Sequence, residues 1–105
     1  MDDSEFEVLA GRALKQIEVA FEASEVDADV SEVSSGILEI EFPDGSQMVI
    51  NRHVANREIW VAARSSGYHF RWDGSVWSDT RAQGDLMTIL SQLASRIVGR
   101  DVLLG

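Results

Sequence analysis

A chain of 105 residues has the size of one domain, and we expect a single domain over residues 1–105, since 45% of the residues are hydrophobic and three Trp and four Phe can supply a core. The net charge of −9 and the absence of cysteine argue against nucleic-acid binding, disulfides and thiolate metal sites. No apolar run approaches the ~18 residues of a membrane span, and no basic or apolar leader is present. We therefore expect a cytoplasmic protein without a membrane partner.

The negative charge lies in the first part of the chain. Residues 2–44 carry thirteen acids and two bases, whereas the later residues carry five acids and seven arginines. The acids from Glu18 to Glu32 have no base among them. Such crowding of like charge destabilises a compact state. The crowded acids therefore indicate a surface that binds cations or a basic protein.

The first predicted element is an amphipathic helix that frays by Asp27. Apolar residues recur at helical spacing from Phe6 to Phe21. Ser4, followed by Glu7 three residues later, has the pattern of a capping box, which predicts Ser4 as the N-cap.

Four carboxylates of this helix are expected on one edge of its packed face. At 100° per residue they fall within about a 60° sector of the helical wheel: Glu7, Glu18, Glu22 and Glu25. No lysine interleaves Glu18 and Glu22 to offset their repulsion. Asp27, Asp29 and Glu32 would extend the row into a patch. The alternative is an ordinary solvated helix face.

A calcium loop does not explain these acids. Asp27, Asp29 and Ser31 have the first three ligand spacings of an EF-hand. The sixth position is Glu32 instead of Gly, and the twelfth is Leu38 instead of Glu. The match fails where the loop geometry is strictest.

From residue 30 the pattern changes to the period of two that is typical of strands. It predicts a short edge strand at 30–33 and further strands at 38–42, 48–51, 58–63, 68–72 and 76–78. Asp44-Gly45 and Asp73-Gly74 are hairpin signals, and a turn is expected at 65–67. Residues 52–57, which include His53, are expected to form a polar connection.

A second helix is predicted from an N-cap at Asp85 to a stop at Gly99. Helix, five or six strands and helix predict an α+β two-layer sandwich, with the N- and C-terminal helices on one face of an antiparallel sheet. The other face would meet solvent. It would present Glu39, Glu41, Asn51, Trp60, His69 and Arg71.

Few residues suggest catalysis. By strand alternation Trp60 lies on the solvated face, either covered by long neighbouring side chains or available as an interface anchor. His53 and His69 are sixteen residues apart, and each is more often a plain surface residue than a metal ligand. No nucleophile elbow, P-loop or dinucleotide fingerprint occurs. The pattern indicates a binding module and not an enzyme.

Several runs of sequence resemble one family. They are D-G-x-x-x-x-I-N-R at 44–52, Ile59-Trp60, G-Y-H-F at 67–70 and D-G-x-x-W at 73–77. Together with the acidic first helix and the closing helix, they resemble the frataxins, in particular their short bacterial form. The resemblance covers nearly the whole chain.

The resemblance implies a protein that binds Fe²⁺ or Fe³⁺ weakly through an acidic ridge. In this sequence the ridge maps to Asp3, Glu7, Glu18, Glu22, Glu25, Asp27, Asp29 and Glu32. It also implies that Glu18, Glu22, Glu25 and Asp29 meet a basic surface of a cysteine desulfurase. Asn51 and Trp60 would face the iron–sulfur scaffold protein, and the protein would be a monomer without iron. Relatives often have His in place of Glu7 and Gln in place of His53.

Three functions follow from the resemblance and the residues. The first is an iron-binding role in iron–sulfur cluster assembly, as a regulator of the desulfurase, an iron donor or both. The alternative is a ferroxidase or iron-detoxifying protein that uses the same carboxylates, although such centres usually need buried, convergent Glu and His ligands. The third is a pure interaction protein whose metal binding is incidental.

Overall fold

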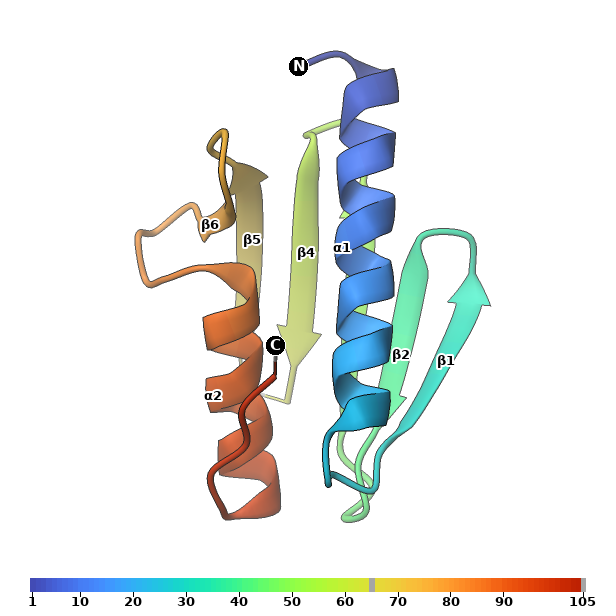
Figure 1. Cartoon of the computed structure of the whole chain (residues 1–105), viewed down its shortest axis with the longest axis vertical. Coiled ribbons are helices and arrows are strands. Elements are labelled where there is room, and N and C mark those ends of the chain that lie inside the picture. Colours follow the sequence, from blue (N-terminus) through green and yellow to red (C-terminus); the bar gives the residue numbers. More distant parts are fainter. Residues whose placement is uncertain (65, 105) are drawn as a thin grey trace.

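The structure, a computed structural model, describes residues 1–64 and 66–104. Two helices enclose six consecutive strands in the sequence (Figure 1). The elements are α1 (Asp3–Ala23), β1 (Asp29–Ser34), β2 (Ile37–Glu41), β3 (Gln47–His53), β4 (Glu58–Ala63), β5 (Ser66–Trp72), β6 (Trp77–Asp79) and α2 (Leu86–Val98). Of the turn expected at 65–67, Ser65 lies outside the described residues, and Ser66 and Gly67 belong to β5.

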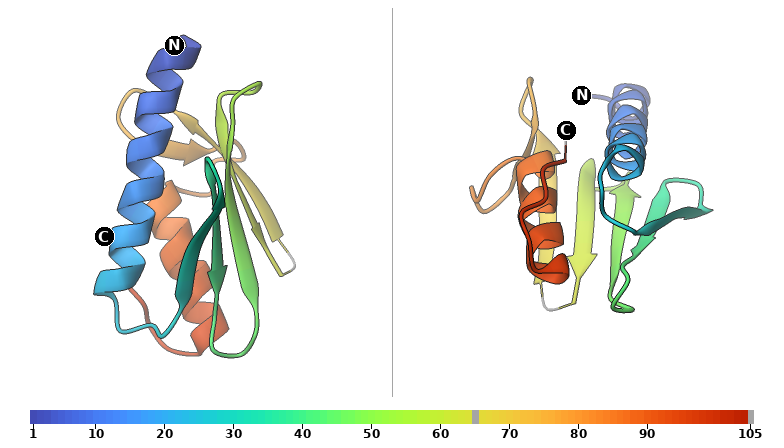
Figure 2. Two further views of the ribbon diagram at one scale, coloured as in Figure 1. Left: turned by 90° about the vertical axis from the view of Figure 1, so that its right-hand side faces the viewer. Right: turned by 60° about the horizontal axis from the view of Figure 1, so that its bottom comes forward.

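The strands form one antiparallel sheet in the order of the chain, β1 to β6. Both helices lie on the same side of this sheet (Figure 2). Consecutive strands can pair in this way because each is joined to the next by a short turn. The predicted α+β two-layer sandwich is confirmed, with six strands. In the described residues, neither helix is long and apolar enough to cross a membrane.

The core lies between the helices and the inner face of the sheet. Strand residues that alternate along the sequence point to this side, which is why they are buried together. The strands contribute Leu38, Ile40, Met48, Ile50, Ile59, Val61 and Phe70, and the helices contribute Phe6, Ile17, Phe21, Leu86, Ile89 and Leu90. Phe6 packs edge-to-face on Trp77, with ring centroids 5.9 Å apart. Trp77 therefore belongs to the core.

The N-terminal helix begins two residues earlier than predicted. Its N-cap is Asp2, whose side chain accepts a hydrogen bond from the Glu5 amide at 2.8 Å, so the prediction of Ser4 was wrong. Aspartate is as good an N-cap as serine, and the earlier start places Asp3 and Glu5 in the first turn, where the helix dipole favours carboxylates.

The same helix ends before Asp27, as expected, but too early to include Glu25. Ala23 is its last residue, and the Ser24 hydroxyl donates to the Phe21 carbonyl at 2.7 Å. Serine side chains compete for backbone groups in this way and favour helix ends. Glu25 consequently lies outside the helix, and its place in the helical row was wrong.

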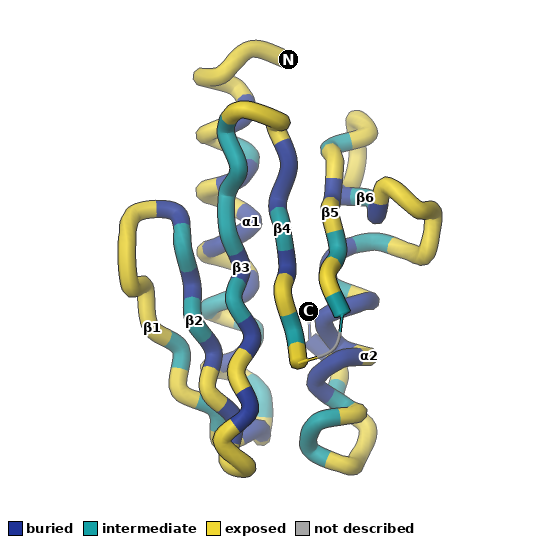
Figure 3. The backbone as a smooth tube through the Cα atoms, turned by 180° about the vertical axis from the view of Figure 1, so that it is seen from behind, coloured by how far each residue is buried: buried dark blue, intermediate teal, exposed yellow. Residues whose placement is uncertain are grey.

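The outer face of the sheet is uncovered in the described residues (Figure 3). The registers Asn51↔Trp60 and Trp60↔His69 place these residues side by side on that face. The expected solvated face is confirmed. His53, however, was expected in a loop, but it is the last residue of β3 and pairs with Glu58. The hairpin connection is only residues 54–57, so the ladder of β3 and β4 extends two residues further, to Arg52 and His53, than the polar sequence suggested.

The C-terminal residues return along α2. Gly99 takes a left-handed conformation with φ of 75°, which ends the helix. The Val102 amide then donates to Ser95 Oγ at 2.8 Å, and the Leu104 amide donates to Ser91 Oγ at 2.9 Å. Two serines one turn apart thus hold the tail, and Leu104 is buried against the core.

This tail yields a stability prediction with a matched control. Leu104 is 2% exposed and Leu103 is 87% exposed. We expect Leu104→Ala to lower the free energy of unfolding by about 2–3 kcal/mol, because it removes buried apolar atoms. Leu103→Ala should change it by less than about 0.5 kcal/mol. Urea unfolding followed by far-UV circular dichroism measures both, and equal effects of the two substitutions would contradict the packing described.

Candidate functional site

The eight candidate iron ligands lie on three consecutive segments. Asp3, Glu7, Glu18 and Glu22 are on α1, Glu25 and Asp27 are in the connection, and Asp29 and Glu32 are on β1. Glu18 is half-buried and the other seven are exposed. Since β1 is the edge strand of the sheet, the connection and β1 carry the acids from the end of α1 onto that edge.

These carboxylates form two groups along α1. Glu7 and Glu18 are eleven residues apart in one continuous helix, so a rise of 1.5 Å per residue separates them by about 16 Å. Asp3 and Glu7 lie near the start of the helix, whereas the remaining acids lie toward its end and beyond it (Figure 1). One ion cannot bridge the two groups.

Half of the carboxylates have internal counter-ions. The pairs are Asp3–Arg57 at 3.1 Å, Glu7–Arg52 at 3.8 Å, Glu18–Lys15 at 2.9 Å and Glu25–Arg100 at 4.0 Å. The expectation that no lysine offsets Glu18 was wrong, because Lys15 lies on the preceding turn. The hydrogen bond and charge of Glu18 raise the pKa of Lys15. In the described residues, Glu22, Asp27, Asp29 and Glu32 form no ion pair.

Arg52 reaches Glu7 across a glycine. A Cβ on Gly36 would lie 2.9 Å from Arg52 Cζ, closer than side-chain carbons approach one another. Gly36 also has a φ of +81°, which an L side chain rarely adopts. The positive φ is the main reason for a glycine in the turn between β1 and β2, since the end of the flexible Arg52 side chain can shift away from a Cβ.

The two acids of β1 point to opposite faces of the sheet. Glu32 pairs with the buried Leu38, so it lies on the helix side. Asp29 pairs with Glu41 on the outer face, where Gln47 donates to Glu39 and Glu41 at 3.4 Å each. Spacing along the sequence had joined Asp29 and Glu32 in one row, which β-pairing does not support. The outer-face acids of β2 instead become neighbours of Asp29.

No preformed metal site is present in residues 1–64 and 66–104. No group of three or more His, Asp or Glu side chains there could hold an ion. His53 and His69 lie on opposite faces of the Trp60 ring, with centroids 3.8 Å and 4.4 Å from it. The indole between them prevents both imidazoles from coordinating one ion at the usual ~2 Å. The candidate ligands that remain are the carboxylates of the acidic surface, of which Glu18 is half-buried.

A buried carboxylate lies beneath this stack of rings. Glu58 Oε1 accepts from Trp60 Nε1 at 2.7 Å, and Oε2 accepts from Arg71 Nε at 2.7 Å. His69 Nδ1 is 3.6 Å from Oε1. Burial by itself raises the pKa of Glu58, but the hydrogen bonds from Trp60 and Arg71 and the charge of Arg71 outweigh it, and the pKa is lowered.

Sequence reasoning missed Glu58 as a site residue, although a signal existed. Alternation along β4 puts residues 58, 60 and 62 on one face, so Glu58 shares the solvated face with Trp60. A carboxylate on that face is expected in water. Only the neighbouring strands reveal that Arg71 and the rings cover it. His53 was missed because its segment was expected to be a loop.

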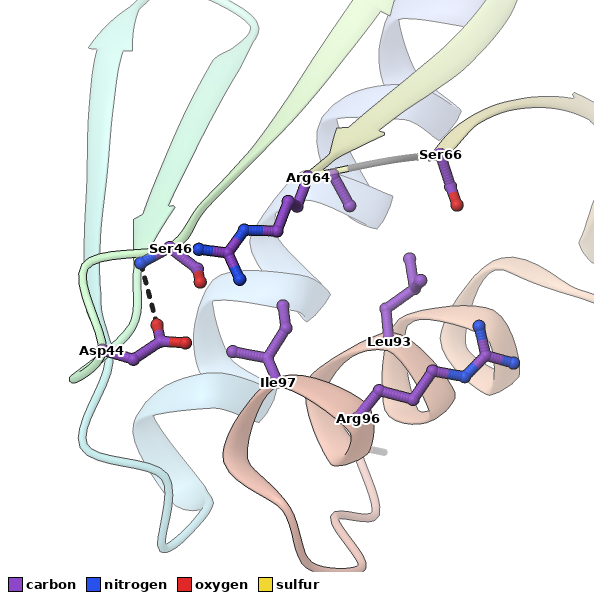
Figure 4. A pocket seen from close by; sticks show the side chains of 8 residues that line it. Asp44, Ser46, Arg64, Ser66, Leu93, Arg96 and Ile97 are labelled. Carbon is purple, nitrogen blue, oxygen red and sulfur yellow. Dashed lines mark hydrogen bonds between the residues drawn. The ribbon is translucent and has the colours of Figure 1, made fainter.

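A cavity of about 230 Å³ lies away from these acids, between α2 and the turns after β2 and β4 (Figure 4). Leu93 and Ile97 form its apolar side, and Asp44 accepts from the Ser46 amide at 2.8 Å. The guanidinium groups of Arg64 and Arg96 point in different directions (Figure 4). None of the eight candidate ligands lines this cavity, so it is separate from the acidic surface.

The fold and its charged surfaces define a class: a two-helix, six-stranded sandwich with an acidic edge and one bare sheet face. Residues 1–100 match the Frataxin-like domain family. Similar proteins named "Iron-sulfur cluster assembly protein CyaY" occur in Dechloromonas aromatica, 52% identical over 99% of both chains, and in Cupriavidus metallidurans, 45% identical over 94% of this chain and 92% of that protein.

A solved structure agrees with these sequence matches. Frataxin from Psychromonas ingrahamii superposes with a TM-score of 0.90 at 29% identity, covering 98% of this chain and 97% of the other. The chain belongs to the frataxin family. The resemblance inferred from the sequence motifs is confirmed.

The contacts of Glu58 predict a pH-dependent contribution to stability. Its lowered pKa means that the folded state favours the carboxylate, so the stabilisation is present above the unfolded pKa of about 4.3 and is lost as the pH falls through the folded value. Glu58→Gln should lower the free energy of unfolding at pH 7 by about 1–3 kcal/mol. The difference in unfolding free energy between this variant and the wild type should decrease below pH ~4.

Urea unfolding at pH 7, 5 and 3.5 tests this, with Glu32→Gln as an exposed control. Glu32 makes no ion pair in the described residues, so its substitution should have an effect below about 0.5 kcal/mol at pH 7. If the difference in unfolding free energy between Glu58→Gln and the wild type stays constant with pH, the charge of Glu58 does not contribute to stability.

Proposed function

We propose that this protein acts in iron–sulfur cluster assembly as an iron-binding partner of the assembly enzymes. The observation that carries the proposal is the 52% identity, over 99% of the chain, to a protein named for iron–sulfur cluster assembly. The acidic surface of α1, the connection and β1 supports it, since a concentration of carboxylates attracts cations and basic proteins.

The first partner is a cysteine desulfurase, which would dock a basic surface on the acidic ridge through Glu18, Glu22, Glu25 and Asp29. Glu22 and Asp29 are exposed and form no ion pair in the described residues, so they can meet incoming cations directly. Glu18 and Glu25 would exchange Lys15 and Arg100 for partner groups. Such contacts speed association and are weakened by salt. Docking there would let the protein regulate the desulfurase.

The second ligand is iron, held weakly as cargo by the same carboxylates. Oxygen ligands suit Fe³⁺ and other hard cations. The carboxylates are mostly exposed, and half of them already have a basic neighbour that iron must displace. Both features favour low affinity, which suits a protein that delivers iron or senses its concentration.

We favour this binding role over a ferroxidase. Ferroxidase centres usually bring Glu and His together inside a helix bundle. Here the two helices face a sheet, both histidines lie on the opposite side of that sheet from the helices, and the candidate carboxylates lie at the surface. The chemistry available is cation binding and protein docking.

The scaffold protein that receives the cluster would contact the outer face of the sheet through Asn51 and Trp60. These residues are opposite one another on β3 and β4. Tryptophan is enriched among residues that dominate binding energies. The two surfaces are distinct, so both partners could bind at once.

Neutralising part of the ridge tests the desulfurase contact. Glu18→Gln, Glu22→Gln and Glu25→Gln together should weaken desulfurase binding at least tenfold at low salt, because three charges of the docking surface are removed. The same variant should lose most iron-induced shifts of nearby amide resonances. Calorimetric titration with the desulfurase and NMR titration with Fe²⁺ measure the two effects.

The matched control removes the same number of charges elsewhere. Glu5, Asp73 and Asp101 are exposed and lie outside the proposed ridge. The combined change Glu5→Gln, Asp73→Asn and Asp101→Asn should weaken binding less than threefold. Equal losses in both variants would mean that only net charge matters, and unchanged binding in the ridge variant would exclude the proposed docking surface.

A further inference from the structure

The cavity between α2 and the turns after β2 and β4 combines apolar and basic side chains (Figure 4). Leu93 and Ile97 of α2 form its apolar side, and the exposed Arg64 and Arg96 lie at its rim. Its volume of about 230 Å³ is below the ~300–1,000 Å³ of pockets that take drug-sized ligands. The cavity therefore suits a small organic molecule.

The two arginines at the rim have no carboxylate partner. Within residues 1–64 and 66–104, neither Arg64 nor Arg96 forms an ion pair. Four other arginines do pair with a carboxylate: Arg52, Arg57, Arg71 and Arg100. The chain has 18 acids and nine bases, so two unpaired bases beside one cavity are a local exception to its acidity. Such a spot attracts an anion.

One carboxylate shares the rim with these arginines. Hydrogen bonds from Ser46 lower the pKa of Asp44, and the nearby charge of Arg64 also lowers it, so Asp44 is ionised at neutral pH. The Arg64 guanidinium extends toward Asp44 and Ser46, whereas that of Arg96 extends away from them (Figure 4). Two positive charges and one negative charge give the rim a net charge of +1, which favours a ligand with a single negative charge.

We propose that this cavity binds a small organic anion that has one carboxylate and a short apolar chain. The carboxylate pairs with the guanidinium groups of Arg64 and Arg96, whose long side chains are exposed and can turn toward it. The apolar chain lies on Leu93 and Ile97, because removal of apolar atoms from water is favourable. The site goes beyond the proposed function and does not depend on it.

Titration of the isotope-labelled protein with hexanoate, followed by NMR at constant ionic strength, tests the site. The amide resonances of Arg64, Leu93 and Ile97 should shift and saturate below about 20 mM, since so small a ligand is expected to bind in the millimolar range. Hexanamide lacks the charge, and acetate lacks most of the chain. Each should bind roughly tenfold more weakly than hexanoate or worse.

Substitution of the arginines tests which groups hold the carboxylate. Arg64→Gln and Arg96→Gln should each weaken hexanoate binding roughly threefold or more, because each removes a charged donor. Arg12→Gln is the matched control. Arg12 is exposed, forms no ion pair in the described part of the chain and lines a different cavity. Its substitution should change the dissociation constant less than about twofold.

A substitution of Asp44 should have the opposite effect. Asp44→Asn keeps an oxygen that accepts from the Ser46 amide, and Asn-Gly suits a hairpin turn as well as Asp-Gly does. The variant removes the one negative charge of the rim, so hexanoate should bind roughly twofold to threefold more tightly.

Several outcomes overturn the proposal. They are the absence of saturable shifts in the wild type, equal affinities for hexanoate and hexanamide, equal effects of the rim and control arginine substitutions, and weaker binding to Asp44→Asn. The comparison of hexanoate, hexanamide and acetate needs only the wild type, so it decides even if a variant does not fold. A failure at this cavity leaves the proposed function intact, because that function is tested by desulfurase and iron binding to the acidic ridge.

Discussion

The sheet buries only one of its faces, because both helices pack on the same side of it, and the rest of the structure depends on this asymmetry. The inner face becomes the core, in which Phe6, Ile17 and Phe70 are fully buried. The outer face is not covered by either helix (Figure 3). It carries polar and aromatic residues such as Asn51, Trp60 and His69. Antiparallel strands allow this division, since alternate residues point to opposite sides. A one-residue slip of register would exchange the two sets.

The second constraint is electrostatic. Most of the excess negative charge lies on α1, the connection and β1, and the arginines that follow partly neutralise it. Arg52 and Arg57 come from the end of β3 and the next turn, and they meet the start of α1. Arg100 comes from the chain after α2 and meets Glu25. Exposed pairs of this kind add little stability. Their larger effect is to determine which carboxylates remain unpaired and can bind an external cation directly.

The proposed iron surface and the bare sheet face thus differ in the side chains that they present. One is an open set of carboxylates without a cage, and the other is a compact stack of rings with a buried carboxylate beneath an arginine. The partners proposed for this protein in cluster assembly, a metal ion and other proteins, do not require a deep cavity. The cavity between α2 and the neighbouring turns is lined by none of the proposed ridge residues.

Periodicity alone predicted the two helices, the strands and the inner face, because burial of apolar side chains dictates spacing of 3.6 and 2 residues. It also predicted that Trp60 lies on the outer face. It misplaced the start of α1 and put Glu25 on this helix, since Asp2 and Ser4 are equally plausible caps and Ser24 competes for backbone groups late in the helix. The choice between alternative helix caps and helix ends depends on small energy differences.

The sequence by itself determined the sandwich, the acidity of its first part and, through its motifs, the family. Only the tertiary structure decided which acids are neighbours and which have counter-ions. Asp29 and Glu32 separate because strand pairing sends them to opposite faces. Glu7 and Arg52 meet although forty-five positions separate them in the chain. Glu58 is buried by residues of β4 and β5. Contacts of this kind arise from strand register and helix packing, and local spacing carries no information about them.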